Sequence, residues 1–97
     1  MPAYAIGIDF EIIDQREFER YLSPAMASLE QYGGRFIVRS ENAELLDGEP
    51  GPKMVVMAEF PSIEIARRWY HSKEYQAVLP IRLASTRGRV FLVDGLS

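Results

Sequence analysis

The stretch AYAIGIDFE, residues 3–11, decides the fold because bulky and small side chains alternate along it. A period of two residues is typical of a β-strand, whose successive side chains point to opposite faces. The pattern predicts one bulky face and one small face, made respectively by Tyr4, Ile6, Ile8 and Phe10, and by Ala5, Gly7 and Asp9.

A helix is predicted to follow this strand. Asp14 begins the capping-box-like sequence DQRE, with Glu17 three residues further on. An apolar stripe at helical spacing comes next, made by Phe18, Leu22, Ala25, Met26, Leu29 and Tyr32. Pro24 lies off the stripe and predicts a kink or a restart. The helix should end at Gly33 and Gly34, because glycine adopts the left-handed conformation without strain.

A second helical region is predicted to begin at Pro61-Ser62. Its inward side should carry five apolar residues: Ile63, Ile65, Ala66, Trp69 and Tyr70. Ser72 can cap a further helical segment, KEYQAVLPIRLAS, in which Pro80 predicts a distortion.

Three further strands are expected at residues 35–40, 53–60 and 88–95, and residues 41–52 should form an irregular hairpin arm around Asp47-Gly48. The order β-α-β-β-α-β predicts an α+β, ferredoxin-like fold with an antiparallel sheet. The last strand should lie beside the first, the first beside the third, and the third beside the second. With 97 residues, the chain should be a single domain, 1–97.

Composition excludes several classes of function. The net charge of −3 argues against a general binder of nucleic acid or of anionic membranes. The chain has no Cys and one His, so thiolate chemistry and a multi-histidine metal site within one chain are excluded. No apolar run approaches the roughly 20 residues that span a bilayer, and the start does not resemble a signal peptide. We therefore expect a soluble, cytoplasmic protein with no cofactor and no metal.

The face of the sheet opposite the helices is predicted to be apolar. It should carry Ala5, Gly7, Ile37, Val55 and Met57. An apolar face of this size is not left in water, and a second copy of the chain is the simplest cover. We therefore expect a homodimer.

Several blocks of the sequence resemble a known family when taken together. They are Gly33-Gly34-Arg35-Phe36, Phe60-Pro61-Ser62, Trp69-Tyr70, Ser72, Glu74-Tyr75 and Gly88-Arg89, with the opening AYAIGIDFEI. Over nearly its whole length the chain resembles the domain-of-unknown-function family 1330 of the dimeric α/β-barrel superfamily. The resemblance implies a ferredoxin-like fold and a dimer but no particular activity. The wider superfamily includes cofactor-independent monooxygenases, haem-degrading enzymes, small isomerases and ligand-sensing domains, so any of these activities would be an analogy of fold.

Arg82 is the most informative residue for function. On a helix that begins after Ser72 it shares a face with Tyr75, Val78 and Leu79, and this face should point at the sheet. An arginine on an apolar stripe is either paired or lines a wet pocket. The sequence leaves open a structural ion pair with Glu59 or Asp9, and a clamp for a carboxylate ligand. A distortion at Pro80 could also rotate Arg82 to the surface.

Four nearby aromatic or titratable residues each have a structural and a functional interpretation. Trp69, Tyr70 and Tyr75 are expected to be core residues, with a pocket wall as the alternative. His71 is a weak catalytic candidate, because its pKa lies near neutrality but helical periodicity places it on the outer side.

Charged residues on the strands complete the candidate site. Arg35 and Arg39 are expected to share one face of their strand, close to Glu59 and Asp9, where opposite charges reinforce a sheet. A ligand role for Arg39 and Glu59 is the alternative. The acidic residues of the arm, Glu41, Glu44, Asp47 and Glu49, do not have the spacing of a calcium loop.

Three functions remain open from the sequence. The first is a dimer that binds a small carboxylate or aromatic metabolite between sheet and helices, with Trp69, Tyr70, Tyr75, Arg82, Arg39 and Glu59 as candidate ligand-binding residues. The second is a cofactor-independent monooxygenase or isomerase, in which His71 or a tyrosine would act. The third is a structural or interaction module with no ligand.

Overall fold

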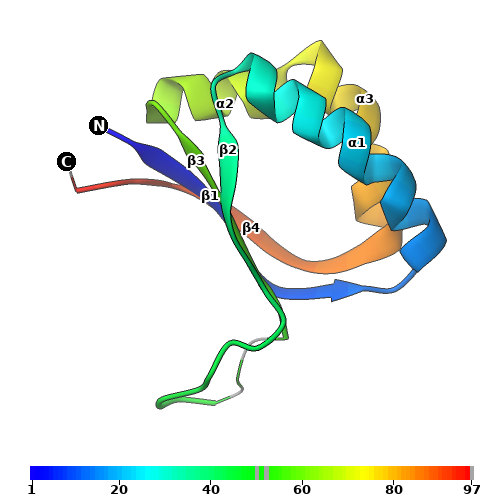
Figure 1. Cartoon of the computed structure of the whole chain (residues 1–97), viewed down its shortest axis with the longest axis vertical. Helices are drawn as coiled ribbons and strands as arrows, with labels where there is room; N and C mark the ends of the chain where they lie inside the picture. The colour runs from blue at the N-terminus through cyan, green and yellow to red at the C-terminus, as the bar shows by residue number, and fades with distance from the viewer. Residues whose placement is uncertain (50, 52, 97) are drawn as a thin grey trace.

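A computed structural model describes residues 1–49, 51 and 53–96 of the chain. Four strands and three helices follow one another, as Figure 1 shows. In chain order they are β1 (Ala3–Ile12), α1 (Gln15–Gln31), β2 (Arg35–Ser40), β3 (Val55–Phe60), α2 (Ile63–His71), α3 (Lys73–Ser85) and β4 (Thr86–Asp94).

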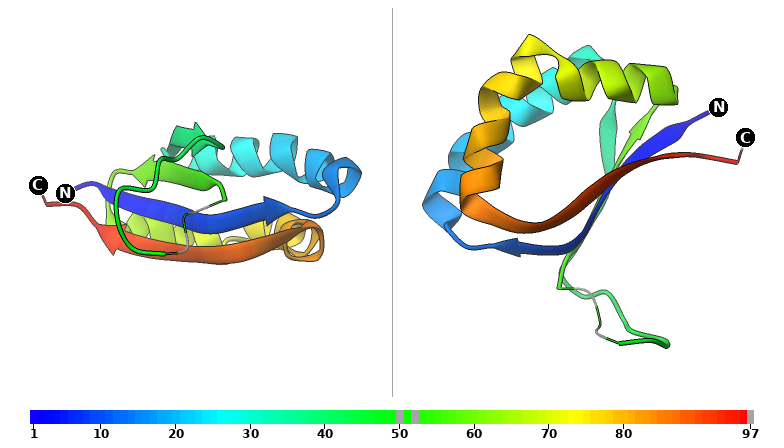
Figure 2. Two further views of the ribbon diagram at one scale, coloured as in Figure 1. Left: turned by 90° about the horizontal axis from the view of Figure 1, so that it is seen from below. Right: turned by 180° about the vertical axis from the view of Figure 1, so that it is seen from behind.

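The strands form one antiparallel sheet in the order β2-β3-β1-β4, which is the predicted order. All three helices lie on the same side of this sheet, as the two views of Figure 2 show. The predicted ferredoxin-like α+β fold is therefore confirmed. The sheet of the single chain is not closed, because β2 and β4 are both edge strands, so "barrel" describes it only loosely.

The helix boundaries follow from capping residues that were visible in the sequence. Asp14 Oδ1 accepts a hydrogen bond from the backbone N–H of Glu17 at 3.1 Å. Ser72 Oγ accepts one from the N–H of Tyr75 at 3.1 Å, so α3 begins immediately after α2 ends. Gly33 ends α1 with a φ of 74°, in the left-handed region. Neither Pro24 nor Pro80 interrupts its helix, and no restart occurs after Ser23.

The prediction of which sheet face the helices cover was wrong for β1. Ala3, Ala5 and Gly7 are buried beneath the helices, whereas Tyr4 and Ile6 lie on the open side. Beneath the helices these small side chains share the core with bulky aromatic side chains from α1, α2 and α3. Periodicity separated the two faces of the strand but could not say which face met the helices.

A β-bulge in β1 moves Phe10 to the small face. The pairing of β1 with β4 shifts between Ile8 and Glu11, and Asp9 has a φ of 54°. A bulge inserts one residue and so reverses the alternation beyond it. Phe10 therefore joins Ala5 and Gly7 in the core instead of continuing the bulky face.

A second bulge, in β2, separates two arginines that were expected to share a face. The pairing of β2 with β3 shifts between Phe36 and Val38. Arg35 pairs with Glu59 across the strands on the open side, with 2.9 Å between Nη2 and Oε1. Arg39 stands opposite Val56 and lies on the helix side. The prediction that Arg35 and Arg39 share one face of the strand was therefore wrong.

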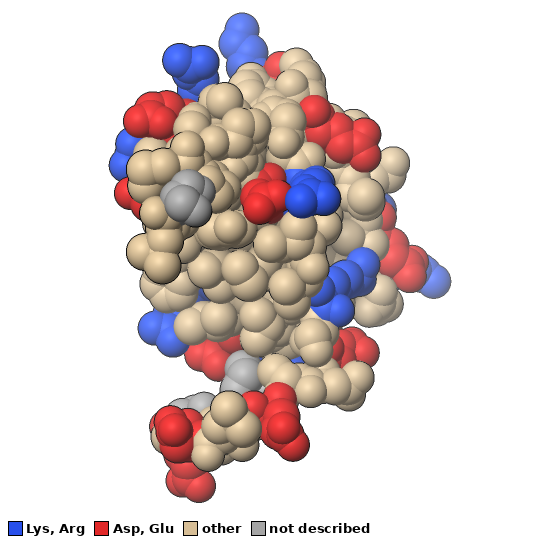
Figure 3. All heavy atoms as spheres, turned by 60° about the vertical axis from the view of Figure 1, so that its left-hand side comes forward, with Lys and Arg blue, Asp and Glu red and all other residues tan. Residues whose placement is uncertain are grey.

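The open face of the sheet is broadly apolar. The register places Ile6 between Met57 and Phe91, and Tyr4 between Glu59 and Val93. Figure 3 shows this side as a largely uncharged surface that is interrupted by one adjacent acidic and basic side chain. Of the residues predicted for this face, Val55 and Met57 are on it, and Ala5 and Gly7 are not.

The arm between β2 and β3 projects away from the body of the protein (Figure 1). Its described residues, 41–49 and 51, contain neither helix nor strand. Leu46, at 87% exposure, has no core position. The predicted turn at Asp47-Gly48 is present as a bend with a φ of 76° at Gly48. In the part of the chain that the structure describes, no helix is long and apolar enough to cross a membrane.

Candidate functional site

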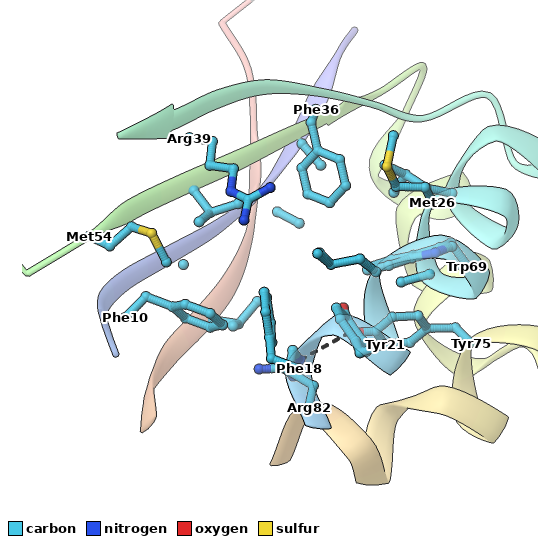
Figure 4. A pocket seen from close by; sticks show the side chains of 18 residues that line it. Phe10, Phe18, Tyr21, Met26, Phe36, Arg39, Met54, Trp69, Tyr75 and Arg82 are labelled. Carbon is cyan, nitrogen blue, oxygen red and sulfur yellow. Dashed lines mark hydrogen bonds between the residues drawn. The ribbon is translucent and has the colours of Figure 1, made fainter. Parts of the chain in front are cut away.

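A cavity of about 220 Å³ lies between the helices and the sheet. Its walls come from every layer of the fold, as Figure 4 shows. Principal lining residues are Phe10, Phe18, Tyr21, Phe36, Arg39, Met54, Trp69, Tyr75 and Arg82. An apolar cavity of about 150 Å³ is enough to hold benzene, so this one can accept a ring together with a small polar group.

Arg82, Tyr75 and Tyr21 form a hydrogen-bonded cluster at one end of the cavity. The Nε of Arg82 donates to the Tyr75 hydroxyl at 3.1 Å. The hydroxyl groups of Tyr75 and Tyr21 are 2.7 Å apart. Helical spacing explains the first contact, since Arg82 follows Tyr75 by two turns of α3 and keeps the same face. Arg82 is only 8% exposed, so Pro80 does not rotate its side chain to the surface.

The structural ion pair of Arg82 with Glu59 or Asp9, which the sequence left open, is not formed. Glu59 pairs with Arg35 and Asp9 pairs with Arg89. Among the described residues, no carboxylate oxygen lies within 4.0 Å of the Arg82 guanidinium. Its partner is the neutral phenol of Tyr75 instead.

The cluster has more hydrogen-bond donors than acceptors. A guanidinium supplies five N–H donors and no acceptor, and each phenol supplies one O–H. Tyr75 already accepts from Arg82, so one of the two phenol protons and most of the N–H groups have no acceptor within the cluster. No side-chain polar atom of the described residues is both fully enclosed and unbonded. Tyr21, Tyr75 and Arg82 all line the cavity, so a ligand there that accepts hydrogen bonds would complement the remaining donors.

Tyr21 is held in its protonated form. Burial raises the pKa of Tyr21 well above the ordinary value for tyrosine, and the neighbouring Tyr75 raises it further. The Arg82 charge lowers the pKa of Tyr21 but does not cancel these effects. Tyr21 therefore acts as a hydrogen-bond donor or acceptor at neutral pH and not as a base.

Trp69 forms the rigid wall beside this cluster. Its Nε1–H donates to Ser28 Oγ at 3.1 Å, and its ring lies 4.1 Å from the Tyr75 ring and 5.1 Å from the Phe60 ring, measured between centroids. Ser28 Oγ donates in turn to the carbonyl of Ala25 at 2.7 Å. Trp69 and Tyr75 are thus core residues, as expected, and they also line the cavity; their role in binding a ligand stays a prediction.

Of the other four candidate site residues, only Arg39 lines the cavity. Arg39 lines the cavity, and in Figure 4 its side chain points into the hollow from the sheet. Glu59 lies on the open face, bound to Arg35, and is not among the residues that line the cavity. Tyr70 is half-buried and packs edge-on against Trp69, outside the lining. His71 is exposed on the outer side of α2, as its periodicity predicted.

Tyr21 was missed by the sequence reasoning. It lies three residues after Phe18 and four before Ala25, so it belongs to the apolar stripe of α1. The signal was this i, i+3, i+7 spacing. Only the packing of α1 against α3 shows that Tyr21 meets Tyr75.

The cavity lining is poor in groups for metal binding or for proton abstraction. Neither Asp, Glu nor His contributes to it. Throughout residues 1–49, 51 and 53–96, no three His, Asp or Glu side chains come together as metal ligands would. What the arrangement can do chemically is hold an anion or stabilise an oxyanion.

These features define a ferredoxin-like α+β protein with a ligand-sized cavity between its helices and its sheet. The chain belongs to the family described as Domain of unknown function (DUF1330), whose model matches residues 2–96. The family was therefore identified correctly from the sequence blocks. A search of curated proteins found no match.

Solved structures with this fold include proteins of unknown function and an oxygenase. A protein of unknown function from Rhodopseudomonas palustris has a TM-score of 0.74 at 16% identity, over 99% of this chain and 83% of that one. SnoaB, a cofactor-independent oxygenase from Streptomyces nogalater, has a TM-score of 0.68 at 14% identity, over 99% and 94%. A dimeric protein of unknown function and ferredoxin-like fold from Bacteroides fragilis has a TM-score of 0.55 at 12% identity, over 97% and 96%. At these identities the likeness concerns the fold alone.

Proposed function

We propose that the protein binds a small organic acid with an apolar body in the cavity between its helices and its sheet. The observation that carries this proposal is the buried Arg82, which among the described residues has a phenol and no carboxylate as its partner. Removing an arginine from water is costly, and a carboxylate normally offsets that cost. A ligand carboxylate would take this place and accept from Arg82 and from the spare phenol proton.

The rest of the cavity suits the apolar part of such a ligand. Phe10, Phe18, Met54 and Trp69 line the cavity together with Arg82. Ligand sites commonly combine apolar walls with a few convergent polar groups. A volume of about 220 Å³ favours a single ring or a short branched chain that carries the acid.

The test is a comparison of acids with their neutral amides. We expect benzoate, phenylacetate or cyclohexanecarboxylate to raise the melting temperature, because a ligand that binds only the folded state stabilises it. The corresponding amides, which have the same shape and no charge, should not. Arg82→Met should abolish the response, whereas Arg68→Met on the exposed side of α2 should retain it. Equal responses to acids and amides would reject the anion site.

We propose further that two copies associate through the open face of the sheet. The apolar surface around Ile6, Met57 and Phe91 supports this, since large exposed apolar patches mark interaction sites. The dimeric protein from Bacteroides fragilis, which has the same fold, also supports it. The helices occupy the opposite face, so dimerisation would leave the helix side free.

A cofactor-independent monooxygenase or isomerase is the alternative function. The Arg82–Tyr75–Tyr21 cluster favours it, because a cation and a phenol proton can stabilise the oxyanion of an enolate. SnoaB, whose fold is similar, is a cofactor-independent oxygenase. Turnover of an acidic ketone or phenol, with consumption of oxygen for a monooxygenase and without it for an isomerase, would support this alternative if it is lost in Arg82→Met and retained in His71→Ala. A structural module without a ligand would instead show no melting shift with any acid.

A further inference from the structure

We propose that the ligand is a two-headed acid, with one carboxylate on Arg82, a second on Arg39, and an apolar body between them. This inference rests on the proposed function and names its ligand class. Arg82 enters the cavity from α3 and Arg39 enters it from β2. Both residues line the cavity, and Figure 4 shows Arg39 pointing into the hollow from the sheet and Arg82 beside Phe18 at the opposite end.

The bulge in β2 is the reason that Arg39 reaches the cavity. With unbroken alternation, Arg39 would share a face with Arg35 and lie on the open side of the sheet. The register shift between Phe36 and Val38 turns Arg39 to the helix side, opposite Val56. Bulges recur beside functional sites, where they re-aim a side chain. Here the bulge places a cation in an otherwise apolar wall.

The surroundings of Arg39 do not neutralise it. Carboxylates on neighbouring strands are bound to other cations: Glu59 to Arg35 and Glu11 to Lys53. Within the described ranges, no carboxylate oxygen is within 4.0 Å of the Arg39 guanidinium. Several arginines on outer helix faces are also unpaired, so the lack of a partner alone means little. What distinguishes Arg39 is that it lines the apolar cavity.

The cavity that the two arginines line has the character of a hydrocarbon site. Phe10, Phe18, Met54 and Val56 are among its lining residues, and no described Asp or Glu is. Two cations that face one apolar cavity repel each other. A dicarboxylate would balance both charges at once, while its chain or ring would fill the apolar middle.

The two arginines should contribute unequally. Arg82 is buried, so its bond to a carboxylate is protected from water, whereas Arg39 is exposed at the mouth. A charge-assisted bond in a partly exposed position should strengthen binding by about tenfold. The second carboxylate is therefore expected to set selectivity, and the first to be required for binding at all.

The test is a calorimetric comparison of adipate and suberate with hexanoate and octanoate, the monocarboxylates of the same chain lengths. For the full-length protein we expect the better-fitting dicarboxylate to bind about tenfold more tightly than its monocarboxylate. Arg39→Gln should remove this preference, by lowering the affinity for the dicarboxylate to about that for the monocarboxylate. Arg67→Gln, an exposed arginine on α2, is the matched control and should keep the preference.

Each other outcome overturns the inference. Equal binding of the dicarboxylate and the monocarboxylate by the wild type would overturn it and leave the proposed acid site standing. A preference that persists in Arg39→Gln would also overturn it, since another group would then hold the second carboxylate. Failure of both classes of acid to bind would overturn the proposed function and this inference together.

Discussion

Arg82 and Tyr75 lie two helical turns apart on the same face of α3, and the Nε of Arg82 donates to the Tyr75 hydroxyl at 3.1 Å. Pro80 lies between them in the chain without ending the helix. The contact fixes the direction of the guanidinium, and Arg82 is among the residues that line the cavity. A buried cation is thus oriented by a neutral group, which is an arrangement suited to receiving an anion.

The first prediction separates binding from stability at this residue. Arg82→Met should abolish acid binding but leave the free energy of unfolding unchanged or higher, because an apolar side chain of similar length avoids the desolvation cost. Thermal unfolding of the ligand-free protein, with and without benzoate, measures both. A loss of more than about 2 kcal/mol in the ligand-free protein would show instead that Arg82 stabilises the fold.

Because Tyr21 is buried, we expect the folded protein to lose stability at alkaline pH. Burial raises the pKa of Tyr21 in the folded protein, so the folded state holds this proton more tightly than the unfolded state does. The resulting stabilisation is complete below the unfolded pKa of about 10 and falls by up to about 1.4 kcal/mol for each pH unit above it. Tyr21→Phe should flatten this decline in urea unfolding curves.

The matched control for this prediction is Tyr4→Phe, on the open side of the sheet. It removes one phenol while leaving the Tyr21–Tyr75 bond intact. The variant should keep the wild-type dependence of stability on pH. An equally steep alkaline decline in Tyr21→Phe would show that other groups cause it.

Much of the fold was predictable because its signals are local. The caps at Asp14, Ser62 and Ser72, and the end of α1 at Gly33, were all readable from short motifs. The inward position of Arg82 also followed from helical spacing. The covered face of β1 did not, because a period of two identifies two faces without saying which one meets the helices.

The remainder of the site was hidden by the two β-bulges. Asp9 and the segment at Ile37 carry no sequence pattern that marks an inserted residue. Each bulge reverses the alternation beyond it and brings one cavity residue inward, Phe10 in β1 and Arg39 in β2. The meeting of Tyr21 with Tyr75 depends on how α1 packs on α3, which no local pattern encodes.

Gly88 should be required for the bulge in β1. Its φ is 138°, and a Cβ atom there would lie 3.0 Å from both the carbonyl oxygen of Asp9 and the Cα of Phe10. Gly88→Ala should therefore destabilise the protein by about 1–3 kcal/mol, measured by chemical unfolding. Gly48→Ala, whose φ of 76° is also positive but whose Cβ would meet no atom within 4 Å, tests backbone strain alone. If the two variants lose the same stability, the close approach to Asp9 and Phe10 contributes nothing.

The last prediction concerns the open face of the sheet. Phe91 stands opposite Ile6 on this face and is 41% exposed in the single chain. Phe91→Glu would bury a charge in the proposed interface, at a cost that an apolar contact cannot offset. We expect wild-type protein to sediment as a dimer at micromolar concentration and Phe91→Glu as a folded monomer.

Leu83→Glu is the control for adding a charge, since Leu83 is 61% exposed on α3, on the helix side. It should leave the dimer intact. A wild-type protein that sediments as a monomer would rule out the dimer, and a dimer that survives Phe91→Glu would place the interface elsewhere. Because the acid site lies on the helix side of the sheet, folded Phe91→Glu should still bind benzoate through Arg82, so that dimerisation and ligand binding are tested separately.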